Sequence, residues 1–274
     1  MKFVGFITLT DVIWLGGVIL FGGWLLKTSL GRKALADSVP RRNNMPFYLP
    51  FIPFSLWLVA APLAILITRE ALPDLPDWQS AFVDKLVLCI GAIVTTGAVI
   101  FLARVSFARR LKGFGLDAKT IVKDFFAGAA NLLAVWPLVI TMIILTTLLG
   151  KLIRGQDFEM QQHQELELIT AHPQLPLRIL IIVLAVVIVP VLEEVLFRGL
   201  LQSMLRGAVK NAWTAIILIS ALFALLHPWM HWPALFTLSM CLGYAYEKSG
   251  SLLRPIFIHS LFNAITIIAI LYSV

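Results

Sequence analysis

The chain has 274 residues, of which 59% are hydrophobic and 14% are charged, and its formal net charge is +7. Soluble domains carry about 25% charged residues, so a water-soluble core is excluded and an all-α, polytopic integral membrane helical bundle is predicted. Cys89 and Cys241 each lie in an apolar run without a CxxC spacing, so they indicate neither a disulfide framework nor a metal knuckle. The N-terminal apolar run has no small-residue cleavage site, and a cleaved signal peptide is not expected.

The apolar runs predict the membrane spans in chain order. A helix needs about 20 mostly apolar residues to cross roughly 30 Å of hydrocarbon, and about eight segments meet or approach that length. We expect one membrane domain over residues 1–274, in which 1–176 supplies four helices and an outside connection and 177–274 supplies a four-helix catalytic core. The polar stretch 151–176 is expected to hold an interfacial helix. The predicted spans are 4–26, 46–68, 81–103, 125–150, 177–205, 212–230, 232–247 and 253–273.

The lysines and arginines gather in the odd-numbered connections between these spans, whereas the even-numbered connections are mainly acidic. The positive-inside rule therefore predicts that the odd connections are cytoplasmic and that both termini lie outside the cytoplasm. The bias and the compact loops favour a bacterial cytoplasmic membrane. Because topology accounts for the positive charge, we expect membrane lipids as partners, anionic ones in particular, and no nucleic acid.

The fifth predicted span carries Glu193, Glu194 and Arg198 after a long apolar run. An ionisable group at the centre of a membrane helix costs at least about 2.5–3.5 kcal/mol and usually marks function. Glu194 and Arg198 have the i, i+4 spacing of an ion pair on one helix face. That pairing leaves Glu193 as the less neutralised carboxylate and a candidate general base. The alternative is a helix end whose charged side chains reach the headgroup layer.

Two later segments add polar side chains at a similar estimated depth. His227 ends the sixth span before Pro228, and His259 and Asn263 lie four residues apart on the last helix. A histidine can share a proton or a water with a carboxylate, and histidine and asparagine N–H groups can hold a developing oxyanion. His227 could instead be an ordinary cap at the outer interface, and His259 and Asn263 could supply interhelical hydrogen bonds.

A zinc site is the main alternative to a metal-free reaction, since Glu193, His227 and His259 could supply three ligands and leave the fourth position open. The sequence contains no HExxH, no GxSxG and no pair of intramembrane aspartates, so other hydrolase mechanisms are weakly supported.

The ordered set of motifs resembles the CPBP family, which comprises type II CAAX prenyl endopeptidases and bacteriocin-processing, or Abi, membrane proteins. The resemblance covers about 75 residues (189–263) and implies an intramembrane endopeptidase, either glutamate-type or metallo-type. It implies that Glu193 and His227 activate water, that His259 and Asn263 stabilise the oxyanion, and that Glu194 and Arg198 support the site. We expect no cofactor, with zinc as the alternative. The motifs are Glu193-Glu194-x-x-x-Arg198, Phe223-x-x-x-His227 and His259-x-x-x-Asn263.

The expected substrate is a membrane-associated peptide or protein, and prenylation does not follow from the resemblance. A non-catalytic membrane scaffold or immunity protein is the alternative from another functional class. A transporter is disfavoured because no inverted repeat is visible.

Overall fold

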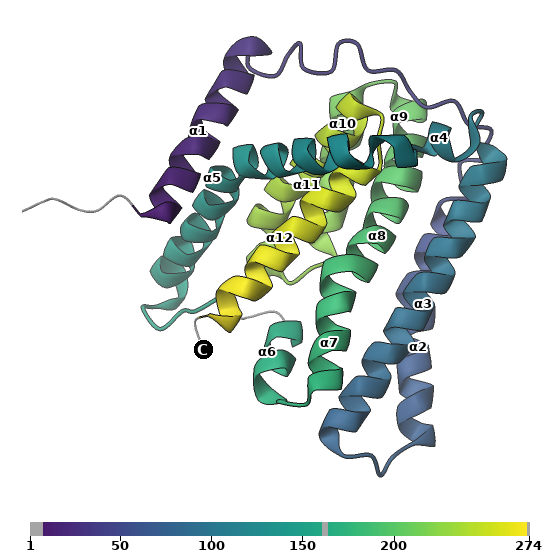
Figure 1. Cartoon of the computed structure of the whole chain (residues 1–274), viewed down its shortest axis with the longest axis vertical. Helices are drawn as coiled ribbons and strands as arrows, with labels where there is room; N and C mark the ends of the chain where they lie inside the picture. Colours follow the sequence, from purple (N-terminus) through teal and green to yellow (C-terminus); the bar gives the residue numbers. More distant parts are fainter. Residues whose placement is uncertain (1–7, 161–163, 273–274) are drawn as a thin grey trace, which may run out of the picture.

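A computed structural model describes residues 8–160 and 164–272, and the regular structure of these residues is helical (Figure 1). The described residues also contain one isolated antiparallel β-bridge, between Asn43 and Phe107. The all-α prediction is therefore confirmed. The elements are α1 (Leu9–Lys27), α2 (Phe51–Ala71), α3 (Asp77–Ser106), α4 (Arg110–Phe114), η1 (Ala118–Thr120), α5 (Ile121–Arg154), α6 (Gln164–Ala171), α7 (Leu175–Val183), η2 (Leu184–Ile188), α8 (Val189–Glu194), η3 (Val195–Gln202), α9 (Ser203–Val209), α10 (Ala212–Leu225), η4 (Trp229–His231), α11 (Trp232–Ser249) and α12 (Leu253–Leu271).

Each predicted span contains a helix, although residues 4–7 of the first lie outside the described residues. Within the described chain, four helical stretches are long and apolar enough to cross a membrane. The count of about eight spans is therefore not confirmed, while a helical bundle with several apolar helices is. The four stretches are Phe51–Ala71, Asp77–Ser106, Ala118–Arg154 and Leu175–Val209.

The sixth predicted span is shorter than the sequence suggested. Helix α10 ends at Leu225, and a turn with the short η4 helix leads into α11 at Trp232. Pro228 has no N–H and restricts the residue before it, which disfavours continuation of the helix. At 1.5 Å per residue, the 14 residues of α10 extend only about 21 Å. The prediction of a span over 212–230 is wrong in its C-terminal part, and His227 follows the helix instead of lying within it.

The helix that carries Glu193 and Glu194 contains two π-helical stretches, η2 and η3. In η2 the Val189 N–H donates to Leu184 O, five residues back. The next residue, Pro190, has no N–H. The carbonyl of Ala185 therefore loses the donors that an α-helix or a π-helix would give it from residues 189 and 190. Such π-stretches inside α-helices often occur at functional sites.

The helix formed by α7 to α9 lies between α3 and α12, because it packs against both (Figure 1). A hydrophobic cluster that includes Leu132, Leu238 and Ile258 joins α5, α11 and α12. A second cluster, with Val99, Leu196 and Phe223 among its members, joins α3, η3 and α10. Helix α6 forms within the stretch expected to hold an interfacial helix, and Ile169 packs there with Leu177 of α7.

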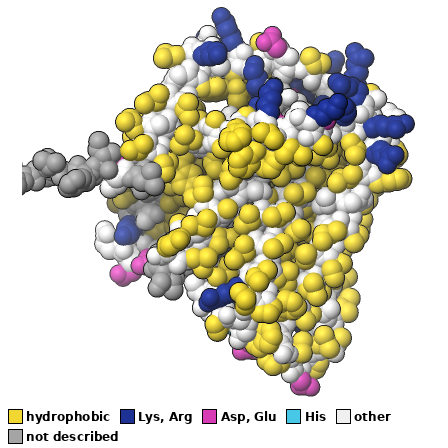
Figure 2. All heavy atoms as spheres, in the orientation of Figure 1, with side chains coloured by type: hydrophobic (Ala, Val, Ile, Leu, Met, Phe, Trp, Pro, Cys, Tyr) yellow, Lys and Arg dark blue, Asp and Glu magenta, His cyan; other side chains and the backbone are white. Residues whose placement is uncertain are grey.

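The outer surface is strongly apolar. Many large hydrophobic side chains are more than half exposed, including Ile19, Val59, Val94 and Phe126. Figure 2 shows that lysines and arginines gather at the end formed by the α1–α2 connection, α4 and the α9–α10 turn, with a yellow apolar surface below them. An apolar surface of this extent is unfavourable in water and suits contact with lipid. The exposed apolar surface and the four long apolar helices together indicate an integral membrane protein.

Candidate active site

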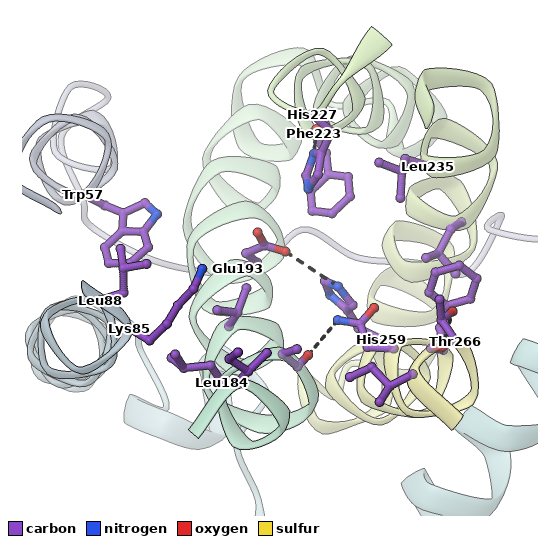
Figure 3. A pocket seen from close by; sticks show the side chains of 17 residues that line it. Trp57, Lys85, Leu88, Leu184, Glu193, Phe223, His227, Leu235, His259 and Thr266 are labelled. Atoms are coloured by element: carbon purple, nitrogen blue, oxygen red, sulfur yellow. Dashed lines mark hydrogen bonds and ion pairs between the residues drawn. The ribbon is translucent and has the colours of Figure 1, made fainter. Parts of the chain in front are cut away.

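A cavity of about 300 Å³ lies between α3, the helix formed by α7 to α9, the end of α10, and α12. Its walls are mainly apolar, with side chains such as Leu184 and Leu238. Four of the six predicted site residues line it, and Figure 3 labels three of them, Glu193, His227 and His259, on different elements. These four are Glu193, His227, His259 and Asn263.

His259 of α12 contacts the two adjacent carboxylates of α8, and Figure 3 shows its contact with Glu193. Its Nδ1 is 2.9 Å from Glu194 Oε1, and its Nε2 is 3.6 Å from Glu193 Oε2. Because a carboxylate oxygen accepts, the proton of the shorter contact belongs to Nδ1. The two glutamates differ in exposure: the Glu193 side chain is 19% exposed, whereas that of Glu194 is fully buried. Glu193 is thus the carboxylate of the pair that faces the cavity.

Arg198 completes the polar cluster behind His259. Its Nη1 donates to Glu194 Oε1 over 2.9 Å, so the structure contains the ion pair that the i, i+4 spacing predicts. Its Nη2 donates to the hydroxyl and the carbonyl of Ser239 on α11. The guanidinium carbon also lies 4.9 Å from the centroid of the Phe223 ring. When His259 is protonated, the two glutamates, Arg198 and His259 have no net charge, which reduces the cost of burying them.

Asn263 lines the cavity one helical turn after His259, and its amide is already partly engaged. Its Nδ2 donates to Ala185 O over 2.7 Å. This is the carbonyl of η2 that lacks a donor from its own helix because of Pro190. Asn263 therefore joins α12 to η2, as the interhelical alternative for this residue anticipated. An amide nitrogen carries two N–H groups, so one remains for another acceptor.

His227 lies on another wall of the cavity, beside Phe223. Its Nδ1 donates to Phe223 O over 2.8 Å, and its own carbonyl accepts from Trp232 Nε1 over 2.7 Å. With Nδ1 protonated, Nε2 of the neutral ring can accept a proton. No hydrogen bond or ion pair joins His227 to Glu193 among the described residues, so the partner of Glu193 is His259.

Lys85 is a cavity residue that the motif analysis missed. It comes from α3 and lines the cavity with Trp57 of α2 and Leu88 of α3. Figure 3 shows these three side chains on the side of the Glu193 helix away from His259. Lys85 falls inside the predicted span 81–103, where an ionisable residue is itself a functional signal.

The described residues contain no group of three or more histidine, cysteine, aspartate or glutamate side chains placed to hold a metal ion. Glu193, His227 and His259 do not form such a group in the arrangement that the structure describes. The arrangement therefore does not fit the three-ligand zinc site considered from the sequence.

The C-terminal third of the chain is similar to a known protein family. Residues 175–265 match the family model of type II CAAX prenyl endopeptidases, Rce1-like. This match confirms the resemblance to the CPBP family that the three motifs indicate, and it implies a membrane protease. The matched segment contains all six predicted site residues, whereas Trp57 and Lys85 lie outside it. No curated protein and no solved structure matches the chain.

Proposed function

We propose that the protein is an intramembrane endopeptidase that hydrolyses a peptide bond with a water molecule activated by Glu193. The observation that carries the proposal is the contact of one imidazole, His259, with two adjacent carboxylates at the wall of an apolar cavity. A partly exposed carboxylate beside an oriented histidine is an arrangement suited to general base catalysis. The family match of residues 175–265 supports the same reaction class.

In the proposed reaction Glu193 takes a proton from water, and the oxygen of that water attacks the carbonyl carbon of the scissile bond. His259 orients Glu193 through Nε2, while Glu194 and Arg198 hold His259 from behind. Because both ring nitrogens of His259 face carboxylates, an orienting role suits it better than the oxyanion role that the resemblance implies. The second N–H of Asn263 is the proposed donor to the developing oxyanion.

His227 is the proposed carrier of the proton that the leaving amine needs. Its Nδ1 donates to a backbone carbonyl, so Nε2 is the ring atom that gains and loses the proton. Collapse of the tetrahedral intermediate breaks the C–N bond, and the amine takes this proton as it leaves. Water supplies the hydroxyl group of the new carboxylic acid and the one hydrogen that the amine gains. The proton that Glu193 takes from water passes on to Nε2 of His227, so both side chains return to their starting state and the reaction balances as a hydrolysis.

The proposed substrate is a membrane-associated peptide or membrane-protein segment. The cavity walls are largely apolar, and the outer surface of the bundle carries many exposed large hydrophobic side chains. A substrate that enters from the membrane would keep its apolar side chains out of water on the way to Glu193. We also propose that the basic end of the bundle faces the cytoplasm, as the charge distribution indicates.

The deciding experiment uses full-length protein in bilayers with a pool of membrane-anchored peptides, and mass spectrometry identifies the cleaved bonds. We expect Glu193→Gln to lower cleavage at least about 100-fold, in line with the usual contribution of general base catalysis. Glu159→Gln, at an exposed site, is the control and should cleave as the wild type does. Full cleavage by a correctly folded Glu193→Gln protein would refute the role of Glu193.

Two further outcomes separate this proposal from its alternatives. Loss of cleavage on chelation, with recovery on zinc addition, would indicate the metallo-type reaction. A protein that protects cells from a membrane toxin equally well with and without Glu193→Gln, and cleaves nothing in the pool, would fit a non-catalytic immunity or scaffold role.

A further inference from the structure

A second hollow lies at the basic end of the molecule, away from the cavity that contains Glu193. It is formed by the α1–α2 connection on one side and by the end of α3 and the start of α4 on the other. Three arginines and two asparagines line it, together with the last two residues of α3 and two residues of the α3–α4 connection. The lining residues are Arg42, Asn43, Asn44, Arg104, Val105, Ser106, Phe107, Ala108 and Arg110.

Backbone pairing brings these two distant segments together. Asn43 and Phe107 form an antiparallel bridge. On either side of it, Asn44 N–H donates to Ser106 O and Ala108 N–H donates to Arg42 O, each over 3.1 Å. Phe107 is buried and packs edge-on against Phe114 of α4. The hollow is therefore held by hydrogen bonds and a packed aromatic pair, rather than by a chance approach of two loops.

The charges around this hollow are not balanced. No carboxylate lines it, and the guanidinium groups of Arg42, Arg104 and Arg110 have no ion pair or hydrogen bond with any residue that the structure describes. All three arginines are exposed. Nearby charged groups behave differently, since Lys112 is 3.3 Å from Asp117 and Arg254 is 2.9 Å from Asp124. Three like charges around one hollow are unfavourable unless an anion compensates them.

The surroundings of the hollow indicate where that anion comes from. Phe101 and Val105 on α3 and Phe47 and Tyr48 before α2 are between 59% and 65% exposed. The hollow thus lies where the basic end meets exposed apolar side chains, and Figure 2 shows dark blue and yellow surfaces next to each other at that end of the molecule. In a bilayer this level corresponds to the headgroups, in which the anions are lipid phosphates.

We propose that this hollow binds a phosphate group through Arg42, Arg104 and Arg110, and that the group belongs to the headgroup of an anionic phospholipid. The guanidinium fork donates two parallel hydrogen bonds to a phosphate, which matches the tetrahedral oxygens better than a point charge does. The amides of Asn43 and Asn44 offer further donors beside the arginines. The acyl chains of the lipid would lie along Phe101 and Val105. The site is independent of the proposed protease reaction.

The test uses full-length protein in bilayers of equal parts phosphatidylglycerol and phosphatidylcholine, from which native mass spectrometry counts the retained lipids. We expect the wild type to retain phosphatidylglycerol preferentially. The triple variant Arg42→Gln, Arg104→Gln, Arg110→Gln should lower that preference about tenfold or more. The matched control Lys27→Gln, Arg32→Gln, Lys33→Gln removes three exposed charges from the same end and should change it less than about twofold.

Equal losses in the two triple variants, or no loss in the first, would overturn the proposal, because either result means that the basic surface attracts lipid without a defined site. If the first triple variant folds poorly, Arg110→Gln is compared with its exposed neighbour Arg109→Gln, and the preference should fall in the former alone. Competition with inorganic phosphate and with glycerol 3-phosphate shows whether the bound phosphate group comes from a free anion or from a lipid headgroup. Displacement of the lipid by either soluble anion at equal concentration assigns the site to free phosphate, and failure to displace it assigns the site to the headgroup.

Discussion

Arg198 and Glu194 lie inside the bundle with both side chains fully buried and a single hydrogen-bonded ion pair between them. Burial of two charges is costly, and mutual attraction offsets that cost only if each keeps its partners. Glu194 has two partners, Arg198 and His259, and Arg198 has two more on Ser239. The pair therefore fixes the orientation of His259, and through it the position of Glu193.

Removal of one side chain of the Glu194–Arg198 ion pair should destabilise the fold more than removal of both charges. We expect Arg198→Met to lower the free energy of unfolding by about 3–5 kcal/mol, because it leaves the Glu194 charge buried and uncompensated. The double variant Glu194→Gln, Arg198→Met should recover at least half of that loss but not cleavage activity. Denaturant unfolding in detergent measures both effects. Lys112→Met, which breaks an exposed ion pair, is the control and should cost about 1 kcal/mol or less.

If the double variant is no more stable than Arg198→Met, the uncompensated charge is not the source of the loss. The packing of Arg198 on the Phe223 ring would then be the main contribution.

Lys85 leads to a prediction about substrate binding. It supplies a cation to the cavity from α3, opposite the histidines. For the cleaved peptide of the pool, we expect Lys85→Met to raise KM about tenfold when an anionic group of the peptide lies in the part of the cavity beside α3. That factor corresponds to about 1.4 kcal/mol, close to a hydrogen bond with a charged group. Steady-state kinetics measure it.

The control is the same peptide with that anionic group replaced by an amide. Lys85→Met should then leave KM nearly unchanged, and Lys85→Arg should resemble the wild type with both peptides. An equal rise in KM for the charged and the amidated peptide would contradict a role in binding the anionic group.

At the scale of elements, the irregular helix formed by α7 to α9 explains why Asn263 faces its neighbour. Pro190 removes one donor and η2 diverts another, so Ala185 O takes its hydrogen bond from α12 instead. A carbonyl left without a donor in an apolar interior costs about 1–3 kcal/mol. Proline, π-stretch and asparagine therefore form one structural unit across two helices.

This dependence predicts a specific coupling. Asn263→Leu should lower the free energy of unfolding by about 1–3 kcal/mol in the wild type. In a Pro190→Ala background the cost should be less than half as large, because the new N–H at residue 190 can donate to Ala185 O. A double-mutant cycle of denaturant unfolding measures the coupling. Thr266→Val is the control, since Thr266 donates within its own helix and should show no coupling to residue 190.

An identical cost of Asn263→Leu in both backgrounds would show that the contribution of Asn263 does not pass through the Ala185 carbonyl.

The sequence predicted the helices well and their internal geometry poorly. Apolar runs located the long helices, because lipid requires continuous apolar length, whereas short helices such as α4 were not predicted. Pro228 indicated a helix end, but the sixth predicted span still extended beyond Leu225, where α10 ends. The π-stretch η2 could not be predicted, because Val189 N–H donates to Leu184 O and Ala185 O accepts instead from Asn263 of another helix.

The same limit applied to the candidate site. The spacing of Glu194 and Arg198 predicted their ion pair, since both lie on one helix. The assignment of His259 to both carboxylates required the angle between α8 and α12, which no spacing within a helix contains. Lys85 was detectable as a cation in an apolar run, but nothing in the sequence connected it with Glu193.

At the scale of the whole molecule, the candidate site is assembled from two parts of different character. The polar cluster belongs to residues 175–265, the segment that matches a known family. The wall with Trp57 and Lys85 belongs to α2 and α3, outside that segment. Reaction chemistry is therefore expected from the C-terminal helices, and substrate preference from the N-terminal ones.

The distribution of charge over the whole molecule leads to a prediction of its orientation. Lysines and arginines gather at one end of the bundle, and Asp74 lies in the connection between α2 and α3 at the other (Figures 1 and 2). Positively charged connections stay in the cytoplasm during insertion, so the basic end should be cytoplasmic. In a protein with Cys89 and Cys241 replaced by alanine, we expect a membrane-impermeant maleimide to label Asp74→Cys in intact bacterial cells and to leave Lys210→Cys unlabelled.

Both positions are exposed, so accessibility within the protein does not distinguish them. Permeabilised cells are the control, because both variants should be labelled once the reagent can reach either side. Labelling of Lys210→Cys alone in intact cells would reverse the orientation. It would also remove the phosphate hollow from the cytoplasmic leaflet, since Arg42 and Arg104 lie at the same end of the bundle as Lys210. The labelling pattern therefore tests the topology and the membrane leaflet of the proposed lipid site in one measurement.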